Sequence, residues 1–284
     1  MSNKKAAMMS GLGIESLIYV KADKNGKMDV NDLELKINAA TLKGQEPFAV
    51  VATLGTTVTG NIDPIKEIIP ICKTHNLWLH ADAIYGGAII LSNKEKYRLD
   101  GIAEADSISF NPQKWMHIAK TCSLLLYKDG EILNRYFGMK AYYTKEQDEY
   151  INLSELNIQG TKQADVLKLW LSVLSIGLSG YEEIIDNSYA FTQEFIDALK
   201  EFSNVEFAST QEMNIPTFRL LGTSDKESDE LNTAFNEYAL KEHNLFFSLP
   251  LYNGRLWQRT ILLNPFLNES IIQKVVNALK QFNK

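Results

Sequence analysis

HADAIYGG, at residues 80–87, and SISFNPQKW, at residues 107–115, decide the predicted fold of this chain. The apolar run from Leu77 leads into the first motif, so Asp82 is predicted to end a buried strand. Asn111 and Pro112 end a second strand and are followed directly by Lys114. Because open α/β sheets bind ligands at the carboxyl ends of their strands, we expect Asp82 and Lys114 to face one crevice.

This pair of residue types suits one cofactor, pyridoxal 5′-phosphate. A lysine amine can form an imine with the cofactor aldehyde, and a carboxylate beside the pyridine nitrogen keeps that nitrogen protonated. Lys114 and Asp82 are the candidates for these two roles. Taken singly, each has an ordinary explanation, since a strand that ends in aspartate is usually only a capped strand and a single lysine usually lies on the surface.

The order of predicted elements indicates an α/β fold with a parallel, doubly wound sheet. Strands are predicted at 17–20, 48–53, 77–82, 107–110 and 123–127, with helices at 2–12, 30–42 (N-cap Asp29) and 64–74. Two further helices, at 161–178 and 180–202, precede a small α/β region with strands at 218–221, 245–249 and 260–263 and helices at 229–243 and 269–281. We expect two domains, one over residues 1–170 and a smaller one over residues 171–284.

Five segments in order along the chain resemble one protein family. They are VVATLGTTVTGNIDP (50–64), HADAIYGG, DSISFNPQKW, LKLWLSVLSIGLSGYEE (167–183) and QRTILLNP (258–265). They are similar to the group II pyridoxal-phosphate-dependent decarboxylases, which include aromatic amino acid, glutamate, cysteine sulfinate and diaminobutyrate decarboxylases. The resemblance implies a fold-type-I structure with an incomplete large parallel-sheet domain and a small C-terminal α/β domain.

The resemblance also implies roles for individual residues. Lys114 matches the lysine that forms the imine, and Asp82 matches the residue that pairs with the pyridinium nitrogen. Thr57 matches a residue whose hydroxyl lies against the cofactor, and His80 lies at the same strand end as Asp82. Asn111 and Gln113 match positions close to the phosphate. The family usually has histidine before the lysine, and glutamine can donate a hydrogen bond without adding charge. Arg259 matches an arginine that binds the substrate carboxylate, although it could instead pair with an acidic neighbour.

A tyrosine-rich loop over residues 138–157 is a second expected part of the site. In the family, a loop tyrosine protonates the substrate-derived carbanion. Tyr150 is the candidate, with Tyr142 and Tyr143 as alternatives and a solvated hinge as the ordinary explanation. The family often has two arginines where this chain has Lys162 and Gln163, which removes the forked geometry of arginine.

The implied function is decarboxylation of an L-amino acid to the amine and carbon dioxide. The chain opens Met1-Ser2-Asn3-Lys4-Lys5, just after the position of a family histidine that stacks on the cofactor ring. We therefore expect this polypeptide alone to be a poor catalyst, and a homodimer or a complex with a separate N-terminal half is the expected assembly. The alternatives are a catalytically impaired remnant or interaction partner, and another lyase or an aminotransferase that uses the same cofactor on the same fold.

Composition narrows the class of protein. The 284 residues carry a net charge of −6 and are 45% hydrophobic, which argues against nucleic acid as a partner and provides for a buried core. No apolar stretch approaches the roughly 18 residues of a membrane span, so a cytoplasmic location is expected. Cys72 and Cys122 are expected in the core. His75, His117 and His243 show no metal-ligand spacing and are assigned ordinary surface or core positions.

Overall fold

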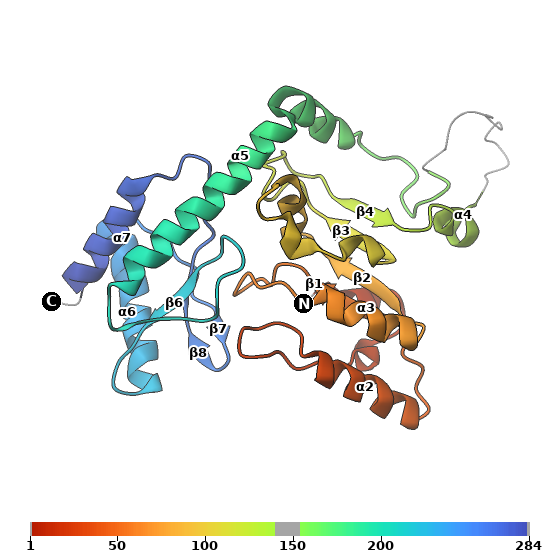
Figure 1. Cartoon of the computed structure of the whole chain (residues 1–284), viewed down its shortest axis with the longest axis horizontal. Helices are drawn as coiled ribbons and strands as arrows, with labels where there is room; N and C mark the ends of the chain where they lie inside the picture. The colour runs from red at the N-terminus through yellow and green to blue at the C-terminus, as the bar shows by residue number, and fades with distance from the viewer. Residues whose placement is uncertain (1, 140–153, 283–284) are drawn as a thin grey trace.

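A four-stranded sheet forms the first region of the molecule (Figure 1). The computed structural model describes residues 2–139 and 154–282. The strands are β1 (Ala49–Thr53), β2 (Trp78–Asp82), β3 (Ser107–Phe110) and β4 (Leu124–Tyr127), and they lie side by side in that order. The first three are parallel and β4 is antiparallel to β3. The α/β class is confirmed, but the described strands follow chain order without the reversal that a doubly wound sheet requires.

Three α-helices precede or connect these strands. They are α1 (Ser2–Met9), α2 (Val30–Leu42) and α3 (Ile65–Thr74). The Asp29 side chain caps α2 as predicted, because its Oδ1 accepts hydrogen bonds from the backbone N–H groups of Asn31 and Asp32. Helix α3 packs against β1 and β2. The connection from β2 to β3 uses short 3₁₀ turns instead, η2 (Gly86–Leu91), η3 (Lys96–Leu99) and η4 (Ile102–Glu104).

The strand predicted at residues 17–20 is wrong. A 3₁₀ helix, η1 (Ile14–Ser16), is followed there by extended backbone that belongs to no sheet of the described chain. Ile18 and Tyr19 are exposed, and the local pairing is limited to a single bridge between Ala22 and Met28. A short apolar run satisfies the strand pattern, but only a neighbouring strand can supply its hydrogen bonds.

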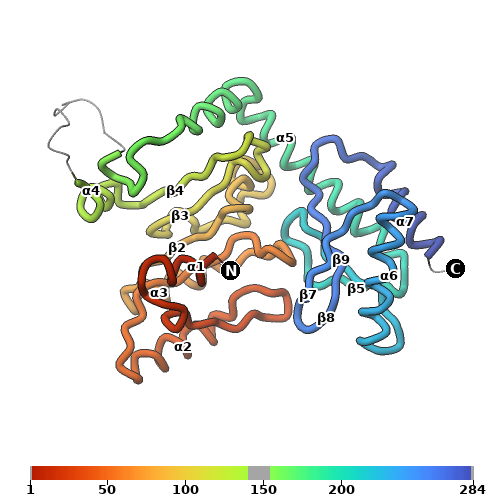
Figure 2. The backbone as a smooth tube through the Cα atoms, turned by 180° about the vertical axis from the view of Figure 1, so that it is seen from behind, coloured from red at the N-terminus to blue at the C-terminus, as the bar shows by residue number. Residues whose placement is uncertain are grey.

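Helix α5 (Val166–Lys200) consists of two helical segments joined at Gly177, close to the break predicted between the helices at 161–178 and 180–202. Gly177 interrupts it with a left-handed conformation, φ 75°, so the predicted break lies within a kinked helix. The helix spans the molecule from the sheet region to the C-terminal region (Figures 1 and 2). Before it, the short helix α4 (Ile132–Phe137) follows β4.

The C-terminal region is built on an antiparallel sheet. Its strands are β5 (Val205–Phe207), β6 (Thr217–Leu220) and β9 (Gln258–Arg259), its helices are α6 (Asp225–His243) and α7 (Glu269–Phe282), and β7 (Leu251–Tyr252) and β8 (Arg255–Leu256) form a separate hairpin. Two predicted strands are wrong. Residues 245–249 contribute only a bridge between Ser248 and Arg259, and residues 260–263 lie beyond β9 as extended chain.

Buried side chains form two clusters, one on each sheet. The first extends from Leu33 to Ile215 and includes Tyr181 and Ile185 of α5. The second begins at Phe195 of the same helix and contains the apolar faces of α6 and α7. Helix α5 therefore contributes to both cores, and the predicted domain boundary near residue 170 stays a prediction.

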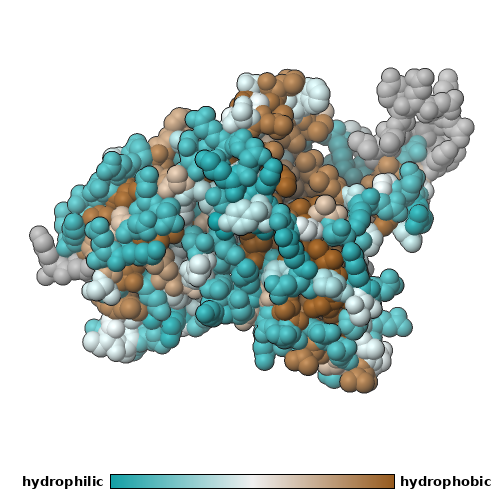
Figure 3. Space-filling model, viewed as in Figure 1, coloured by the Kyte–Doolittle hydropathy of each residue, from teal (hydrophilic) through white to brown (hydrophobic). Residues whose placement is uncertain are grey.

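The first half of α5 carries exposed apolar side chains. Trp170 is 62% exposed, and Leu167, Leu171 and Leu174 are exposed beside it. Figure 3 shows hydrophobic surface at the top of the view, where Figure 1 places this half of the helix. Among the described residues, no helix is both long and apolar enough to cross a membrane.

Candidate functional site

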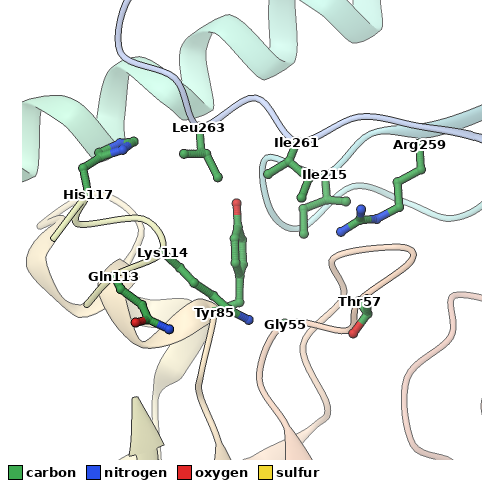
Figure 4. Close-up of a pocket in the computed structure, with 10 residues that line it drawn as sticks. All are labelled: Gly55, Thr57, Tyr85, Gln113, Lys114, His117, Ile215, Arg259, Ile261 and Leu263. Carbon is green, nitrogen blue, oxygen red and sulfur yellow. The ribbon is translucent and has the colours of Figure 1, made fainter. Parts of the chain in front are cut away.

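A pocket of about 340 Å³ lies where the two regions meet (Figure 4). Its lining residues come from both sides of the molecule: Gly55, Thr57, Tyr85, Gln113, Lys114 and His117 from the ends of the parallel strands, and Ile215, Arg259, Ile261 and Leu263 from the C-terminal region. Four residues predicted from the sequence, Thr57, Gln113, Lys114 and Arg259, are thus brought together around one cavity.

Lys114 is held on a loop of successive tight turns after β3. Its backbone N–H donates to the carbonyl of Asn111, and the backbone N–H of His117 donates to the carbonyl of Lys114. Each of these hydrogen bonds has a donor–acceptor distance of 3.1 Å. The Gln113 side chain accepts a hydrogen bond from the backbone N–H of Cys122 at 2.9 Å, which links the beginning of the loop to the segment that leads into β4. This bonding leaves the amide NH₂ of Gln113 available as a donor in the pocket wall.

The Lys114 amine is tuned by its surroundings. Burial lowers its pKa, the carboxylate of Asp82 raises it, and the guanidinium of Arg259 lowers it further. The net effect is a pKa below the ordinary value of lysine, which increases the fraction of neutral amine near neutral pH. A neutral amine is the form that attacks a carbonyl carbon.

Asp82 and His80 lie on one face of β2, because alternate residues of a strand point the same way. Asp82 is the register partner of Ser109 on β3, and His80 that of Ser107. His80 Nδ1 lies 2.8 Å from Ser107 Oγ. Asp82 does not line the pocket directly, but its negative charge raises the pKa of both Lys114 and His80 against the larger lowering effect of burial.

Thr57 lies in a closed loop after β1. The backbone N–H of Thr56 donates to the carbonyl of Asn61 at 2.8 Å, and Thr56 Oγ1 lies 2.8 Å from Thr59 Oγ1. Glycine is required at position 86, because a Cβ atom there would clash with the carbonyl oxygen of Leu54. The LGTT and HADAIYGG segments therefore pack against each other and shape one wall.

Arg259 is placed by two backbone pairings. It lies opposite Thr217 of β6 and exchanges two backbone hydrogen bonds with Ser248, of 2.8 and 3.0 Å. Burial lowers the pKa of its guanidinium, and Tyr85 raises it. Its Nε is buried without a hydrogen-bond partner in the described chain, which leaves a donor for a ligand in the pocket.

Two pocket residues were missed as functional candidates. Tyr85 stacks on Trp115 with ring centroids 5.4 Å apart and donates a 2.6 Å hydrogen bond to Asn214 Oδ1, and burial raises its pKa. His117 lines the pocket with a left-handed backbone, φ 56°, and its assignment to an ordinary role stays a prediction. The position of Tyr85 inside HADAIYGG was an available signal, whereas His117 had none.

The remaining candidates have different outcomes. Asn111 contributes its backbone carbonyl to the Lys114 loop but does not line the pocket. Tyr150, with Tyr142 and Tyr143, lies outside the described residues. Cys72 and Cys122 are buried free thiols, as predicted. Among the described residues, no group of three or more histidine, cysteine or acidic side chains is arranged to hold a metal ion.

Comparison with known proteins gives a consistent result. Residues 1–221 match the model of the pyridoxal-dependent decarboxylase conserved domain. The chain is 33% identical to the cysteine sulfinic acid decarboxylase of Rattus norvegicus, over 99% of this chain and 60% of the relative. It is 32% identical to the acidic amino acid decarboxylase GADL1 of Mus musculus, over 93% of this chain and 51% of the relative. The chain thus spans between half and three fifths of these relatives.

Solved structures agree with the sequence matches. Mouse CSAD in its apo form superposes with a TM-score of 0.90 at 30% identity, covering 100% of this chain and 62% of that one. Oryza sativa TDC with PLP and tryptamine superposes with a TM-score of 0.92 at 22% identity, covering 98% and 59%, a likeness that concerns the fold alone. The predicted fold-type-I class is therefore confirmed.

Proposed function

Because the chain belongs to the pyridoxal-dependent decarboxylase family, we propose that it takes part in removing carbon dioxide from an L-amino acid with pyridoxal 5′-phosphate as cofactor. The observation that carries the proposal is the pocket that places Lys114 opposite Arg259, with Asp82 close enough to act on the Lys114 charge. When bound, the cofactor supplies an electron-accepting ring for the negative charge that develops at the substrate α-carbon.

The residues in and beside the pocket fit pyridoxal 5′-phosphate. Lys114 offers an amine of lowered pKa for covalent attachment to the aldehyde, and Asp82 offers a carboxylate that can hold a proton on the pyridine nitrogen. Ser109 Oγ, on the register partner of Asp82, and Arg259 Nε are buried polar atoms without partners in the described chain. Thr57 and Gln113 add neutral donors to the same wall.

The remaining steps are assigned to side chains of this chain. Arg259 orients a substrate carboxylate through its planar fork of donors. The apolar side chains Ile215, Ile261 and Leu263 cover the pocket and exclude water near the reacting carbon. Tyr150 is proposed as the group that returns a proton to the α-carbon. Acidic amino acids are the proposed substrate class, supported by Arg259 and by the names of the relatives matched above.

We also propose that the working assembly contains more than one polypeptide, either two copies of this chain or this chain with a separate N-terminal half. Exposed apolar side chains on α5 and on β4, among them Trp170, Leu125 and Leu126, support a covered surface in the assembly. Light scattering of the purified chain over a concentration series tests whether two copies associate. Co-purification tests whether the chain binds a separate N-terminal half.

A cofactor titration tests the function. We expect added pyridoxal phosphate to produce the absorption band of a lysine imine with one equivalent bound, and carbon dioxide to be released from an acidic amino acid. Lys114→Ala should abolish the band, while Lys120→Ala, an exposed lysine on the same loop, should keep it. An unchanged cofactor spectrum with the wild-type chain in its working assembly, or a band that survives Lys114→Ala, contradicts the proposal.

A further inference from the structure

Three side chains of β2 and β3 form a hydrogen-bonded chain that leads toward Asp82. Trp78 Nε1 donates to Ser107 Oγ at 2.8 Å, and the same oxygen lies 2.8 Å from His80 Nδ1. Ser107 is only 4% exposed, so water competes little for its hydroxyl group. His80 and Ser107 are register partners on adjacent strands, which fixes the geometry of this contact through the sheet itself.

The direction of each hydrogen bond follows from the donors present. An indole N–H can only donate, so the Ser107 oxygen accepts from Trp78. The Ser107 proton then points to an acceptor, and in the described chain His80 Nδ1 is the hydrogen-bonding neighbour that remains. A hydroxyl that donates to Nδ1 requires this nitrogen to be unprotonated, so the arrangement goes with a neutral imidazole whose proton lies on Nε2.

The charge state of His80 agrees with this assignment. Burial lowers the pKa of His80 and the negative charge of Asp82 raises it, with burial as the larger effect. The imidazole is accordingly neutral near pH 7 and carries a single proton. Trp78, His80 and Asp82 share one face of β2, so the His80 ring and the Asp82 carboxylate start from the same side of the sheet.

We propose that Trp78, Ser107 and His80 are positioning residues that fix the Nε2–H tautomer of His80 and thereby orient the carboxylate of Asp82. The inference rests on the proposed role of Asp82 toward a pyridine nitrogen. Side chains behind a binding group commonly set its orientation and proton position in this way. Trp78 and Ser107 thus act on the position of Asp82, although neither residue lines the pocket.

The tautomer is measurable without the cofactor. In protein labelled with ¹⁵N-histidine, long-range ¹H–¹⁵N spectra distinguish protonated from unprotonated ring nitrogens, and His80→Gln assigns the His80 signals among the four histidines. We expect Nε2–H in the wild type, a mixture of both tautomers in Ser107→Ala, and the wild-type pattern in Ser107→Thr. A proton on Nδ1 in the wild type, or an unchanged pattern in Ser107→Ala, overturns the proposal.

A binding measurement tests the effect on Asp82. The dissociation constant of pyridoxal phosphate should rise about two- to tenfold in Ser107→Ala, as for the loss of one hydrogen bond, and return toward wild type in Ser107→Thr. Thr233→Ala, which removes an exposed hydroxyl on α6, is the matched control. A tautomer that shifts while affinity stays constant overturns the positioning role.

The two proposals fail in different ways. A wild-type chain that binds no cofactor contradicts the proposed function, while the histidine spectra still decide the arrangement of Trp78, Ser107 and His80. If Ser107→Ala does not fold by circular dichroism, Trp78→Phe replaces it, since loss of the indole donor frees the Ser107 hydroxyl to turn. We expect the same shift in tautomer, and an unchanged pattern there counts against the proposal.

Discussion

The two walls of the pocket are built in different ways. The wall that carries Lys114 and Thr57 comes from the carboxyl ends of parallel strands, and each of its residues lies within or next to a short sequence motif. The opposite wall, with Ile215, Arg259 and Ile261, comes from antiparallel pairings between segments far apart in the chain. The first wall is fixed by local turns, whereas the second depends on long-range register.

This difference predicts where the site is fragile. The Lys114 loop closes on itself through hydrogen bonds between near neighbours. Arg259 depends on correct pairing with both Thr217 and Ser248, and a slip of one residue in β9 would turn its side chain to the other face of the sheet. Changes in the C-terminal core should therefore disturb the substrate side of the pocket more than the lysine side.

The largest expected effect is on stability, for Phe218→Ala in the C-terminal core. Phe218 is fully buried beside the register pair of Arg259 and packs against the rings of Phe195 and Phe247. We expect the free energy of unfolding to fall by about 3–5 kcal/mol. Urea denaturation followed by circular dichroism and tryptophan fluorescence should still give one transition, because α5 contributes to both cores.

The control for this variant is Phe246→Ala, since Phe246 is 76% exposed and should change stability by less than about 0.5 kcal/mol. Two separate transitions in the denaturation of Phe218→Ala would contradict this expectation. The two walls would then belong to units that unfold independently, and the long helix would not couple them.

The next effect in size is on substrate binding, for Arg259→Gln. Loss of a charged, forked donor should cost about 1.5–3 kcal/mol, which corresponds to a KM for an acidic amino acid about 10- to 100-fold higher. Arg255→Gln is the control, because Arg255 forms an exposed ion pair with Asp225 at 3.0 Å. Equal KM values for the two variants would remove Arg259 from the substrate site.

The same variant has a predicted effect on pH dependence. Arg259 lowers the pKa of Lys114, so its removal should raise that pKa and leave less neutral amine at a given pH. The rate of imine formation between pyridoxal and the chain, measured against pH, should therefore shift to higher pH. An unshifted profile would show that the two walls do not interact electrostatically, and a profile shifted to lower pH would contradict the predicted sign of the interaction.

The sequence could predict one wall and much less of the other. Asp82 and Lys114 were predicted from the chemistry of contiguous motifs at strand ends, and Thr57 was predicted through the family resemblance of the LGTT segment. Arg259 was found through resemblance, but its strand was predicted too late in the chain, since an alternating apolar pattern at 260–263 does not reveal which residues pair. The position of His117 in the pocket depends on a left-handed turn and on a hydrogen bond with the backbone of Leu263. The residues around His117 in the sequence indicate neither feature.

A smaller effect is expected for Gly254→Ala in the hairpin between β7 and β8. Asn253 and Gly254 have φ values of 51° and 75°, as a two-residue hairpin turn with both residues left-handed requires. The Asn-Gly pair was therefore a usable hairpin signal that the sequence interpretation missed. A Cβ at Gly254 meets no atom within 4 Å, so the cost is backbone strain of about 1 kcal/mol in unfolding free energy.

The control for the hairpin is Gly130→Ala, where a Cβ also meets nothing within 4 Å and φ is not left-handed. Its unfolding free energy should stay within about 0.5 kcal/mol of wild type. Equal losses in the two variants would mean that the turn conformation at Gly254 does not matter.

An effect of similar size concerns the start of α6, which begins at Asp225 and not at the predicted Asp229. Ser224 caps the helix by accepting a 3.2 Å hydrogen bond from the backbone N–H of Glu227, and the spacing of serine and glutamate is the pattern of a capping box. Ser224→Ala should lower the unfolding free energy by about 1 kcal/mol, while Ser224→Asp should keep the cap. Denaturation curves measure both. If alanine and aspartate are equally stable, the helix start is held by packing against β6 and not by its cap, and this side of the molecule would depend on long-range contacts even for its helix boundaries.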